Sequence, residues 1–242
     1  MRLFLSSIFI VIGLSTAYAE THSHWTYDGE AGPEQWAKLS SEYSACAGKN
    51  QSPINLIGIV EAELTPIAFS YQAGGSEIVN NGHTVQVNFK PGSSIKLDGV
   101  EYVLKQFHFH TPSENQIDGR SYPMEGHLVH ADSNGNLAVV AVMFTEGSDN
   151  KGIAEAWTVL PKNGETNVIP RSISAAGILP VNRDYYRFNG SLTTPPCTEG
   201  VRWIVMKNSV PVSQQQIQAF SQVIPHSNNR PVQALNARVV LK

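Results

Sequence analysis

The feature that most constrains this chain is a pair of histidines one residue apart, in the segment Gln106-Phe107-His108-Phe109-His110. The residues before it, 99–105, are rich in β-branched and aromatic side chains, which is typical of a strand. Side chains alternate faces along a strand, so Gln106, His108 and His110 share one face. Two imidazoles about 7 Å apart on one face form half of a metal site. The other half would come from a neighbouring strand.

A candidate third ligand is His127, in the segment Glu125-Gly126-His127-Leu128-Val129-His130. This segment is followed by a turn-forming stretch at 132–136 and then by a continuous apolar run at 137–144. The order strand, turn, strand predicts a β-hairpin. In a strand, Glu125, His127 and Val129 share one face and His130 lies on the other. The alternative is a helix that joins His127 and His130 at i, i+3, and the turn and the Val-rich partner strand argue against it.

Each histidine segment also carries an acceptor two residues before its ligand, Gln106 before His108 and Glu125 before His127. A metal-bound imidazole usually has its other nitrogen held by a carboxylate, amide or backbone oxygen. Three neutral histidines suit Zn²⁺ with an open fourth position, which is a catalytic arrangement. Any one of these histidines alone would be read as an ordinary core or surface residue, but the set predicts a catalytic zinc site.

Residues 1–19 have the pattern of a secretory signal peptide, with Arg2, an apolar stretch at 3–14 and the small-residue signature Ala17-Tyr18-Ala19. The apolar stretch is too short to span a membrane, so we expect cleavage after Ala19 and export rather than anchoring. Residues 20–242 contain no Gly/Ser linker, repeat or charge block, which favours a single domain. A formal net charge of −3 gives no indication of a nucleic-acid or anionic-membrane partner.

The chain has two cysteines, Cys46 and Cys197. Two cysteines in an exported domain usually pair, although two free thiols remain the alternative. Closing so long a loop would contribute about 4–5 kcal/mol in the chain-entropy model. Neither cysteine lies in a Cys-x-x-Cys pair, which argues against a redox or zinc-ribbon role.

Most of the remaining pattern indicates strands. Leu64–Tyr71 reads as one strand, and a turn at 79–84 leads into another on which Val85, Val87 and Phe89 share a face. Strands at 186–192 and 201–206 flank the stiff loop Thr193-Thr194-Pro195-Pro196. Helical signals are few. They are a short helix within 149–159 with Asn150 as a possible N-cap, and a helix from Ser213 with Gln216 at the capping-box position.

Taken together, these segments resemble an α-class carbonic anhydrase, and specifically an exported bacterial one. The likeness runs from His24-Trp25 to Arg230-Pro231 and is most specific at 106–110, 125–130 and Gly190–Pro196, with support from Gln51-Ser52-Pro53 and Asn81-Gly82-His83. The resemblance implies a mainly β (α+β) fold, with one domain built around a large twisted, mostly antiparallel sheet and a few short helices.

The resemblance also implies roles for individual residues. His108, His110 and His127 match the zinc ligands, and Gln106 and Glu125 match the partners of the first and third ligand. Thr193 matches a gatekeeper threonine whose hydroxyl proton Glu114 accepts, and His83 matches the proton shuttle. The remaining matches are Thr194 beside the bicarbonate site; Tyr27, Asn81 and Gln86 ordering the shuttle waters; Val129, Val139, Leu192, Val201 and Trp203 forming the CO₂ wall; and Cys46 with Cys197 forming the disulfide common in bacterial members.

The activity implied is zinc-dependent, reversible hydration of carbon dioxide to bicarbonate and a proton, by attack of zinc-bound hydroxide, in the periplasm. Sulfonamides and anions are the inhibitors expected for such a site, and the sequence leaves monomer and homodimer both open. Two departures from animal members, Thr111-Pro112 after the second ligand and Gln86 in place of an asparagine, lie beside the site.

Three rival functions are weighed against this one. A related binding module that has lost catalysis would typically lack a ligand histidine, and all three are present. An exported zinc hydrolase would need a site for a larger acyl or peptide group, and none is recognisable, so ester cleavage is at most a side activity. A periplasmic zinc carrier would show His- or Asp-rich tracts, and the sequence has none.

Overall fold

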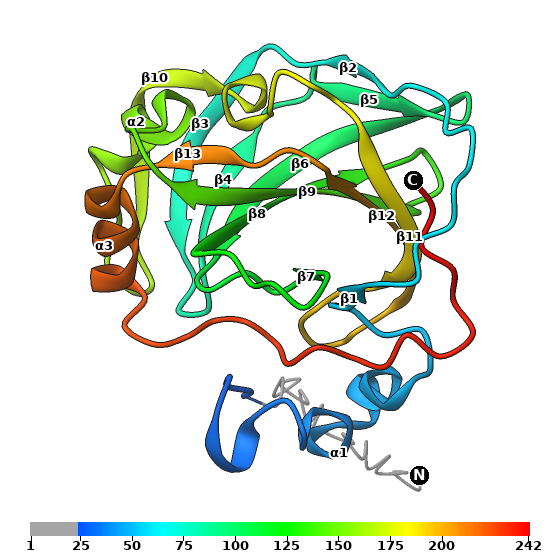
Figure 1. Cartoon of the computed structure of the whole chain (residues 1–242). Coiled ribbons are helices and arrows are strands. Elements are labelled where there is room, and N and C mark those ends of the chain that lie inside the picture. Colours follow the sequence, from blue (N-terminus) through cyan, green and yellow to red (C-terminus); the bar gives the residue numbers. More distant parts are fainter. Residues whose placement is uncertain (1–23) are drawn as a thin grey trace, which may run out of the picture.

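A computed structural model describes residues 24–242, so the signal peptide expected at 1–19 lies outside the described residues. The chain forms one large, strongly curved mixed sheet of eleven strands and a small two-stranded sheet, β1 with β7 (Figure 1). The main order is β10-β3-β4-β6-β8-β9-β12-β11, with β5 joining β2 to β6 and β13 pairing with β9. All pairs of this sheet are antiparallel except β9 with β12 and with β13. The mainly β fold with few short helices is therefore confirmed.

The strands are β1 (Asn55–Leu56), β2 (Ala68–Ser70), β3 (Ala73–Asn80), β4 (Val85–Phe89), β5 (Ser94–Leu97), β6 (Val100–His110), β7 (Gln116–Ile117), β8 (Met124–Ala131), β9 (Leu137–Glu146), β10 (Thr166–Ser174), β11 (Tyr185–Ser191), β12 (Glu199–Met206) and β13 (Val210–Val212). The helices are η1 (Gly29–Ala31), α1 (Trp36–Leu39), η2 (Ser41–Ala47), α2 (Lys151–Trp157), η3 (Ala175–Ile178) and α3 (Gln214–Val223).

The central strand β9 shows how the sheet separates two hydrophobic cores. Its side chains are buried on both faces, as expected for a strand with parallel neighbours. Val140, Val142 and Phe144 pack into the larger core. The intervening Val139, Ala141 and Met143 pack into a second core on the opposite face. This period of two carries across the sheet and decides which face holds the histidines.

The helices α2 and α3 close the larger core and support β6 from behind. In α2, Asn150 is the N-cap as expected, and its side-chain oxygen accepts from the Gly152 backbone N–H. In α3, Ser213 and Gln216 form the expected capping box. Phe109 packs edge-on against Trp157, with ring centroids 5.0 Å apart. The end of β6 that carries the histidines therefore rests on both α2 and α3, which lie together at one side of the sheet (Figure 1).

One expected strand is shorter than predicted, and several other strands were not predicted. The strand expected at Leu64–Tyr71 is only β2, because Pro66 has no N–H to donate and the ladder begins beyond it. The strand β3 was missed because it begins Ala73-Gly74-Gly75, a weak strand signal. At Gly75, an added Cβ would lie 2.9 Å from side-chain atoms of both Ile173 and Phe89, so the flanking strands leave room only for glycine. The strands β5, β7, β10 and β13 were also not predicted.

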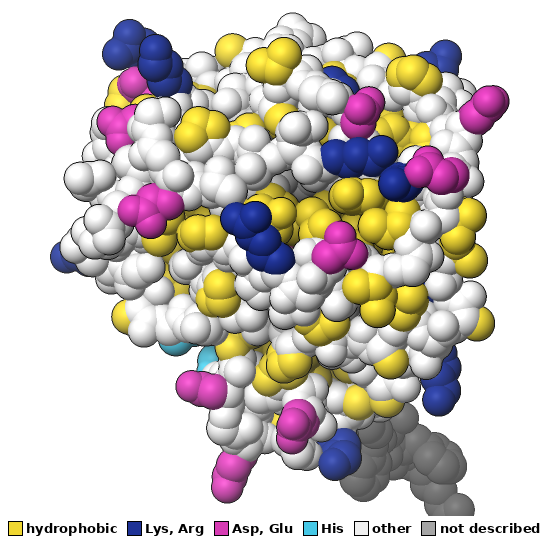
Figure 2. Space-filling view, viewed as in Figure 1, with side chains coloured by type: hydrophobic (Ala, Val, Ile, Leu, Met, Phe, Trp, Pro, Cys, Tyr) yellow, Lys and Arg dark blue, Asp and Glu magenta, His cyan; other side chains and the backbone are white. Residues whose placement is uncertain are grey.

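The surface agrees with the modest net charge. On the face shown in Figure 2, lysine and arginine side chains are interspersed with aspartate and glutamate. Among the charged side chains of the described residues, Asp98 accepts hydrogen bonds from Arg187 and Arg202. None of the helices within residues 24–242 is long and apolar enough to cross a membrane.

Candidate metal centre

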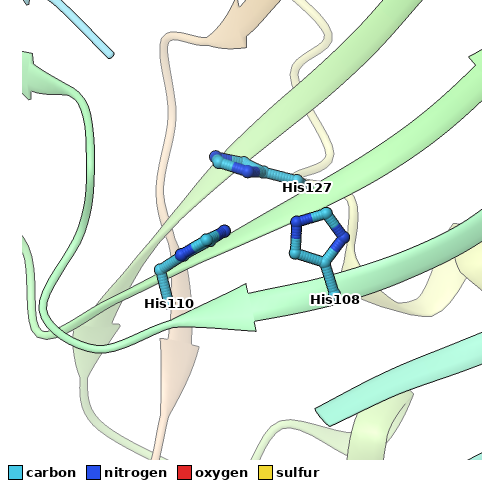
Figure 3. A group of neighbouring side chains, drawn as sticks. All are labelled: His108, His110 and His127. Atoms are coloured by element: carbon cyan, nitrogen blue, oxygen red, sulfur yellow. The ribbon is translucent and has the colours of Figure 1, made fainter. Parts of the chain in front are cut away.

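The three candidate ligands meet on one face of the sheet. His108 and His110 alternate with the core residues Phe107 and Phe109 on β6, and His127 lies directly opposite His108 on the antiparallel neighbour β8. One nitrogen from each imidazole lies within 4.8 Å of the others. Figure 3 shows the three rings converging from the two strands. The hairpin of β8 and β9 is present as expected, and the helical alternative for 125–130 is wrong.

The second nitrogen of each imidazole has a hydrogen-bond partner. His108 Nδ1 donates to Gln106 Oε1 at 2.8 Å, and His127 Nε2 donates to Glu125 Oε1 at 2.8 Å. His110 Nδ1 donates to the backbone carbonyl of Asn228 at 2.6 Å. These bonds assign the tautomers and leave His108 Nε2, His110 Nε2 and His127 Nδ1 as the nitrogens able to bind a metal.

Asn228 was not anticipated by the sequence analysis. The atom that contacts His110 is a backbone oxygen, and it lies 118 positions along the chain from its partner. A carbonyl has the same chemistry in every residue type, so no sequence signal could have identified it.

The environment keeps the three histidines neutral. Burial is the largest cause lowering the pKa of His108 and His127 well below the ordinary value, and it also lowers the pKa of His110. Neutral imidazoles retain the lone pairs that a metal needs. His110 Nε2 is buried without a hydrogen-bond partner among the described residues. This orphaned nitrogen, beside two others of the same kind, fits a borderline-soft divalent ion such as Zn²⁺.

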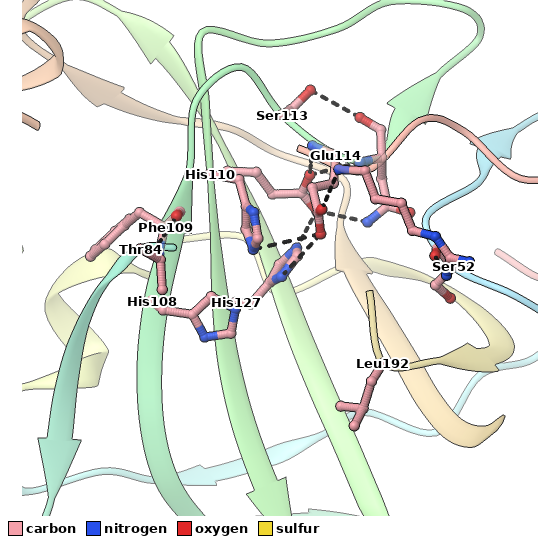
Figure 4. Close-up of polar contacts among 12 residues, drawn as sticks. Ser52, Thr84, His108, Phe109, His110, Ser113, Glu114, His127 and Leu192 are labelled. Atoms are coloured by element: carbon pink, nitrogen blue, oxygen red, sulfur yellow. Dashed lines mark hydrogen bonds and ion pairs between the residues drawn. The ribbon is translucent and has the colours of Figure 1, made fainter. Parts of the chain in front are cut away.

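Glu125 is held rigidly behind His127. Its carboxylate is fully buried and accepts from the backbone N–H groups of Glu114 and Asn115, at 2.7 and 2.8 Å, and from Asn115 Nδ2 at 2.7 Å. Together with the His127 bond, these contacts fill both oxygens. Figure 4 shows Glu114, one of these partners, beside the three histidines. The orientation of His127 is therefore fixed by the loop that follows β6.

The side chain of Glu114 faces the ligating nitrogens of two histidines. Its Oε1 accepts from the Arg230 backbone N–H at 2.8 Å, and its Oε2 lies 3.5 Å from His110 Nε2 and 3.9 Å from His127 Nδ1. Burial raises the pKa of Glu114 to about 8, while the Arg230 N–H and the Thr193 side chain act to lower it. Among the described residues, Glu114 Oε2 has no hydrogen-bond partner, so it is a second buried polar atom without a partner that lies near the ligating nitrogens. A cation held by the histidines would favour the ionised carboxylate.

The predicted CO₂ wall residues belong to one apolar cluster on the histidine face. Val139, Val201 and Trp203 are buried in the second core, and Val129 and Leu192 pack against it while remaining partly exposed. The Trp203 and His127 rings stand edge to face, with centroids 4.9 Å apart. A small apolar molecule against Val129 and Leu192 would therefore lie close to the ligand cluster.

The loop with Thr193 and Thr194 is tied down by the disulfide and by a buried arginine. Cys46 and Cys197 are bonded, which confirms the expected pairing. The guanidinium of Arg230 donates to the Cys46 carbonyl at 3.1 Å and to Gln51 Oε1 at 2.8 Å. Gln51 Nε2 in turn donates to the Cys197 carbonyl at 3.1 Å. The backbone of Arg230 thus holds Glu114, and its side chain holds the anchor of the Thr193 loop.

His83 lies in the turn before β4, at the edge of a cavity of about 450 Å³ that is also lined by Tyr27, Asn81, His24 and His226. Its ring stacks on Trp25, with centroids 3.7 Å apart. Burial, and then the nearby His24 and His226, lower its pKa from the ordinary value.

The three residues assigned to the shuttle waters are placed differently. Asn81 Oδ1 accepts from the backbone N–H groups of His83 and Thr84, so it shapes the turn. Tyr27 lies beside Asn81 in the cavity, whereas Gln86 lies opposite His108 in the β4–β6 pairing. Their roles toward water stay predictions.

Comparison with known proteins places the whole arrangement in one family. The family model described as eukaryotic-type carbonic anhydrase matches residues 31–242. A carbonic anhydrase of Pectobacterium carotovorum is 44% identical over 238 residues, covering 97% of this chain and 98% of the relative.

Among solved structures, a hyperthermostable carbonic anhydrase from an active hydrothermal vent chimney superposes with a TM-score of 0.88. It is 52% identical, and the match covers 90% of this chain and 99% of that one. The α-carbonic anhydrase of Thermovibrio ammonificans in complex with sulfanilamide gives a TM-score of 0.90 at 47% identity, covering 91% of this chain and 99% of that one.

Proposed function

Since this chain belongs to the α-class (eukaryotic-type) carbonic anhydrase family, we propose that it hydrates carbon dioxide reversibly at a Zn²⁺ site formed by His108, His110 and His127. Membership makes the chain a carbonic anhydrase, and the proposal concerns how its own residues carry the reaction. The observation that carries the proposal is the convergence of three imidazole nitrogens, each on a ring whose other nitrogen is already hydrogen bonded.

The three histidines would hold the metal and leave its fourth coordination position open. Zn²⁺ on three neutral histidines lowers the pKa of a bound water to about 7, as is established for carbonic anhydrase, and so provides a nucleophile at neutral pH. Gln106, Glu125 and the Asn228 carbonyl hold the rings in the tautomers that leave the ligating nitrogens unprotonated.

Thr193 and Glu114 would orient the nucleophile. Donation of the Thr193 hydroxyl proton to Glu114 would leave the threonine oxygen able only to accept from the reacting hydroxyl, and the lowering effect of Thr193 on the pKa of Glu114 supports this direction. The Arg230 backbone N–H stabilises the ionised form of Glu114 that this direction requires. Thr194, which is next to Thr193 and half-buried, would contact the bicarbonate product.

The apolar wall would hold the substrate. Carbon dioxide has no net dipole and gains little from polar contacts, so a surface formed by Val129 and Leu192 over Val139, Val201 and Trp203 suits it. Because that wall adjoins His127, the substrate carbon would lie beside the point toward which Thr193 directs the nucleophile.

His83 would carry the proton away. None of the three ligands can release its lone pair to accept a proton, so a separate group that titrates near neutral pH is needed at the mouth. His83 is partly exposed and lines a cavity together with Tyr27 and Asn81, which supports this role and a water path past these two residues. Gln86, opposite His108 in the β4–β6 pairing, would extend that path toward the ligands.

Stopped-flow CO₂ hydration, before and after chelation, tests the proposal. We expect one bound zinc per chain by elemental analysis, fast hydration that is lost with the metal, and recovery when Zn²⁺ is returned. Inactivity of the protein with a full complement of zinc would refute the proposed roles of Thr193 and Glu114. In addition, His83→Ala should slow turnover in weak buffer and be rescued by imidazole, and an unchanged rate in weak buffer would refute the shuttle assignment.

The site and the compartment lead to two further proposals. The sulfonamide complex of the relative from Thermovibrio ammonificans supports sulfonamide and anion inhibition at the same metal position. The disulfide supports folding in an oxidising compartment. We therefore infer that residues 1–19 direct export to the periplasm and are cleaved off. Mass spectrometry of the secreted protein should find Glu20 as its first residue.

A further inference from the structure

The side chain of Asn228 stands between two segments that the sheet register would otherwise pair. The ladder between β4 and β6 ends where Gln86 lies opposite His108. Continued by three residues, the same register would bring His83 opposite Thr111. Instead, Asn228 Oδ1 accepts from the Thr111 N–H at 2.8 Å and Asn228 Nδ2 donates to the His83 carbonyl at 3.0 Å. The amide is thus inserted between the two strands where they separate.

The other polar groups of Asn228 are also in use. Its Nδ2 donates a second bond, to the Phe109 carbonyl at 2.9 Å, and its backbone carbonyl accepts from His110 Nδ1 at 2.6 Å. The residue is completely buried. One residue therefore contacts a candidate ligand through its backbone and the turn with His83 through its side chain.

We propose that Asn228 is a positioning residue for proton transfer, and that its inserted amide fixes the separation of His83 from the three-histidine site. The inference rests on the proposed shuttle role of His83. It adds that the backbone of His83 is held at both ends, at its N–H by Asn81 and at its carbonyl by Asn228. With its Cα fixed in this way, the imidazole can move only by rotation of its own side chain.

The chemistry of the position favours asparagine. Two carbonyls and one N–H must be satisfied at once, which requires two donors and one acceptor on a short planar group. Aspartate has no proton to donate to the carbonyls of His83 and Phe109. Serine is too short to span the gap, and glutamine would widen it by a methylene group. Loss of the amide leaves buried polar groups unpaired, so the turn would move to satisfy them.

The test separates proton transfer from the hydration step. Asn228→Ser and Asn228→Asp are compared with His83→Ala by kcat in weak buffer, kcat with added imidazole, and kcat/KM for CO₂. We expect kcat in weak buffer to fall about tenfold, since displacement of a reacting group by about 1 Å can have still larger effects. Imidazole should restore it, and kcat/KM should fall much less. Asn150→Ser is the matched control, because Asn150 is also buried and bonded through its amide but lies in the α2 cap.

A structural readout accompanies the kinetics. In protein loaded with Co²⁺ in place of Zn²⁺, paramagnetic relaxation of the His83 ring protons reports their distance from the metal. We expect this relaxation to change in both Asn228 variants and to stay constant in Asn150→Ser. In the wild-type protein, the Asn228 side-chain amide protons should exchange with solvent at least about a hundredfold more slowly than those of exposed Asn134.

Several results would overturn the inference. Unchanged kcat in weak buffer together with unchanged relaxation of the His83 protons would exclude a positioning role. A parallel loss of kcat, kcat/KM and bound metal would also exclude it, because that pattern would mean that Asn228 only supports His110. Fast exchange of the Asn228 side-chain amide protons in the wild-type protein would also exclude the positioning role, and this result does not depend on whether either variant folds. A normal rate for His83→Ala would instead refute the shuttle, and the relaxation measurement would then decide the placement of His83 by itself.

Discussion

Replacing Glu125 with glutamine should weaken metal binding without changing the shape of the site. The carboxylate is fully buried and receives four hydrogen bonds, two at Oε2 from the backbone N–H groups of Glu114 and Asn115, and two at Oε1 from Asn115 Nδ2 and His127 Nε2. All four partners are donors. A glutamine of the same size must present an NH₂ group to two of them.

Both orientations of that glutamine are unfavourable. An NH₂ group at the Oε2 position would face two buried backbone N–H groups, and leaving each unpaired costs about 1–3 kcal/mol. At the Oε1 position it would face His127, which could then accept only by moving its proton to Nδ1, the nitrogen directed at the metal site. Metal binding would have to reverse that change, so zinc affinity should fall about 10- to 100-fold, or about 1.4–2.7 kcal/mol.

The assay is equilibrium competition for Zn²⁺ with a chelator of known affinity, at constant pH. Glu199→Gln is the control, since Glu199 accepts similar bonds from the Asn50 N–H and from Gln51 but lies away from the histidines. The ¹⁵N chemical shifts of His127 in the metal-free variant should report a proton on Nδ1. A zinc dissociation constant within twofold of wild type, in a folded variant, would refute the argument that Glu125 selects the tautomer of His127.

Three further predictions concern stability, each measured by urea unfolding. Replacing Cys46 and Cys197 by serine opens a loop with a sequence separation of 151 and should cost about 2–5 kcal/mol, so an unchanged midpoint would contradict the entropic account. Burial lowers the pKa of His130 to about 4, so below pH 6.5 the unfolded chain binds a proton that the folded chain excludes. Between pH 7 and pH 5 wild type should therefore lose about 2 kcal/mol that His130→Gln keeps, and equal pH slopes would contradict this. Ser213→Ala should cost about 1 kcal/mol by removing the α3 cap that Ser213 shares with Gln216, whereas a neutral result would show the cap to be dispensable.

Local rules in the sequence were sufficient for the centre of the site. The period of two placed His108 and His110 on one face with Gln106, and the turn at 132–136 identified the segment with His127 as a strand of the β8–β9 hairpin. The pairing of that hairpin with β6 was decided by tertiary structure. The same rules located the N-caps Asn150 and Ser213. These features depend on residues a few positions apart, where side-chain direction follows directly from backbone geometry.

The sequence was least informative where backbone atoms make the contact. The Asn228 carbonyl on His110 and the Arg230 N–H on Glu114 involve groups that every residue carries, so their positions are decided only when distant segments pack together. The strand β3 likewise exists because β4 and β10 pair with it, despite its glycines.

The sequence by itself determined which side chains could bind a metal and which face of the sheet they occupy, because that information is local and specific to residue type. Only the tertiary structure decided how the histidines are oriented and how the turn with His83 is attached to them. Those features depend on long-range packing and on backbone hydrogen bonds, which residue identity does not encode.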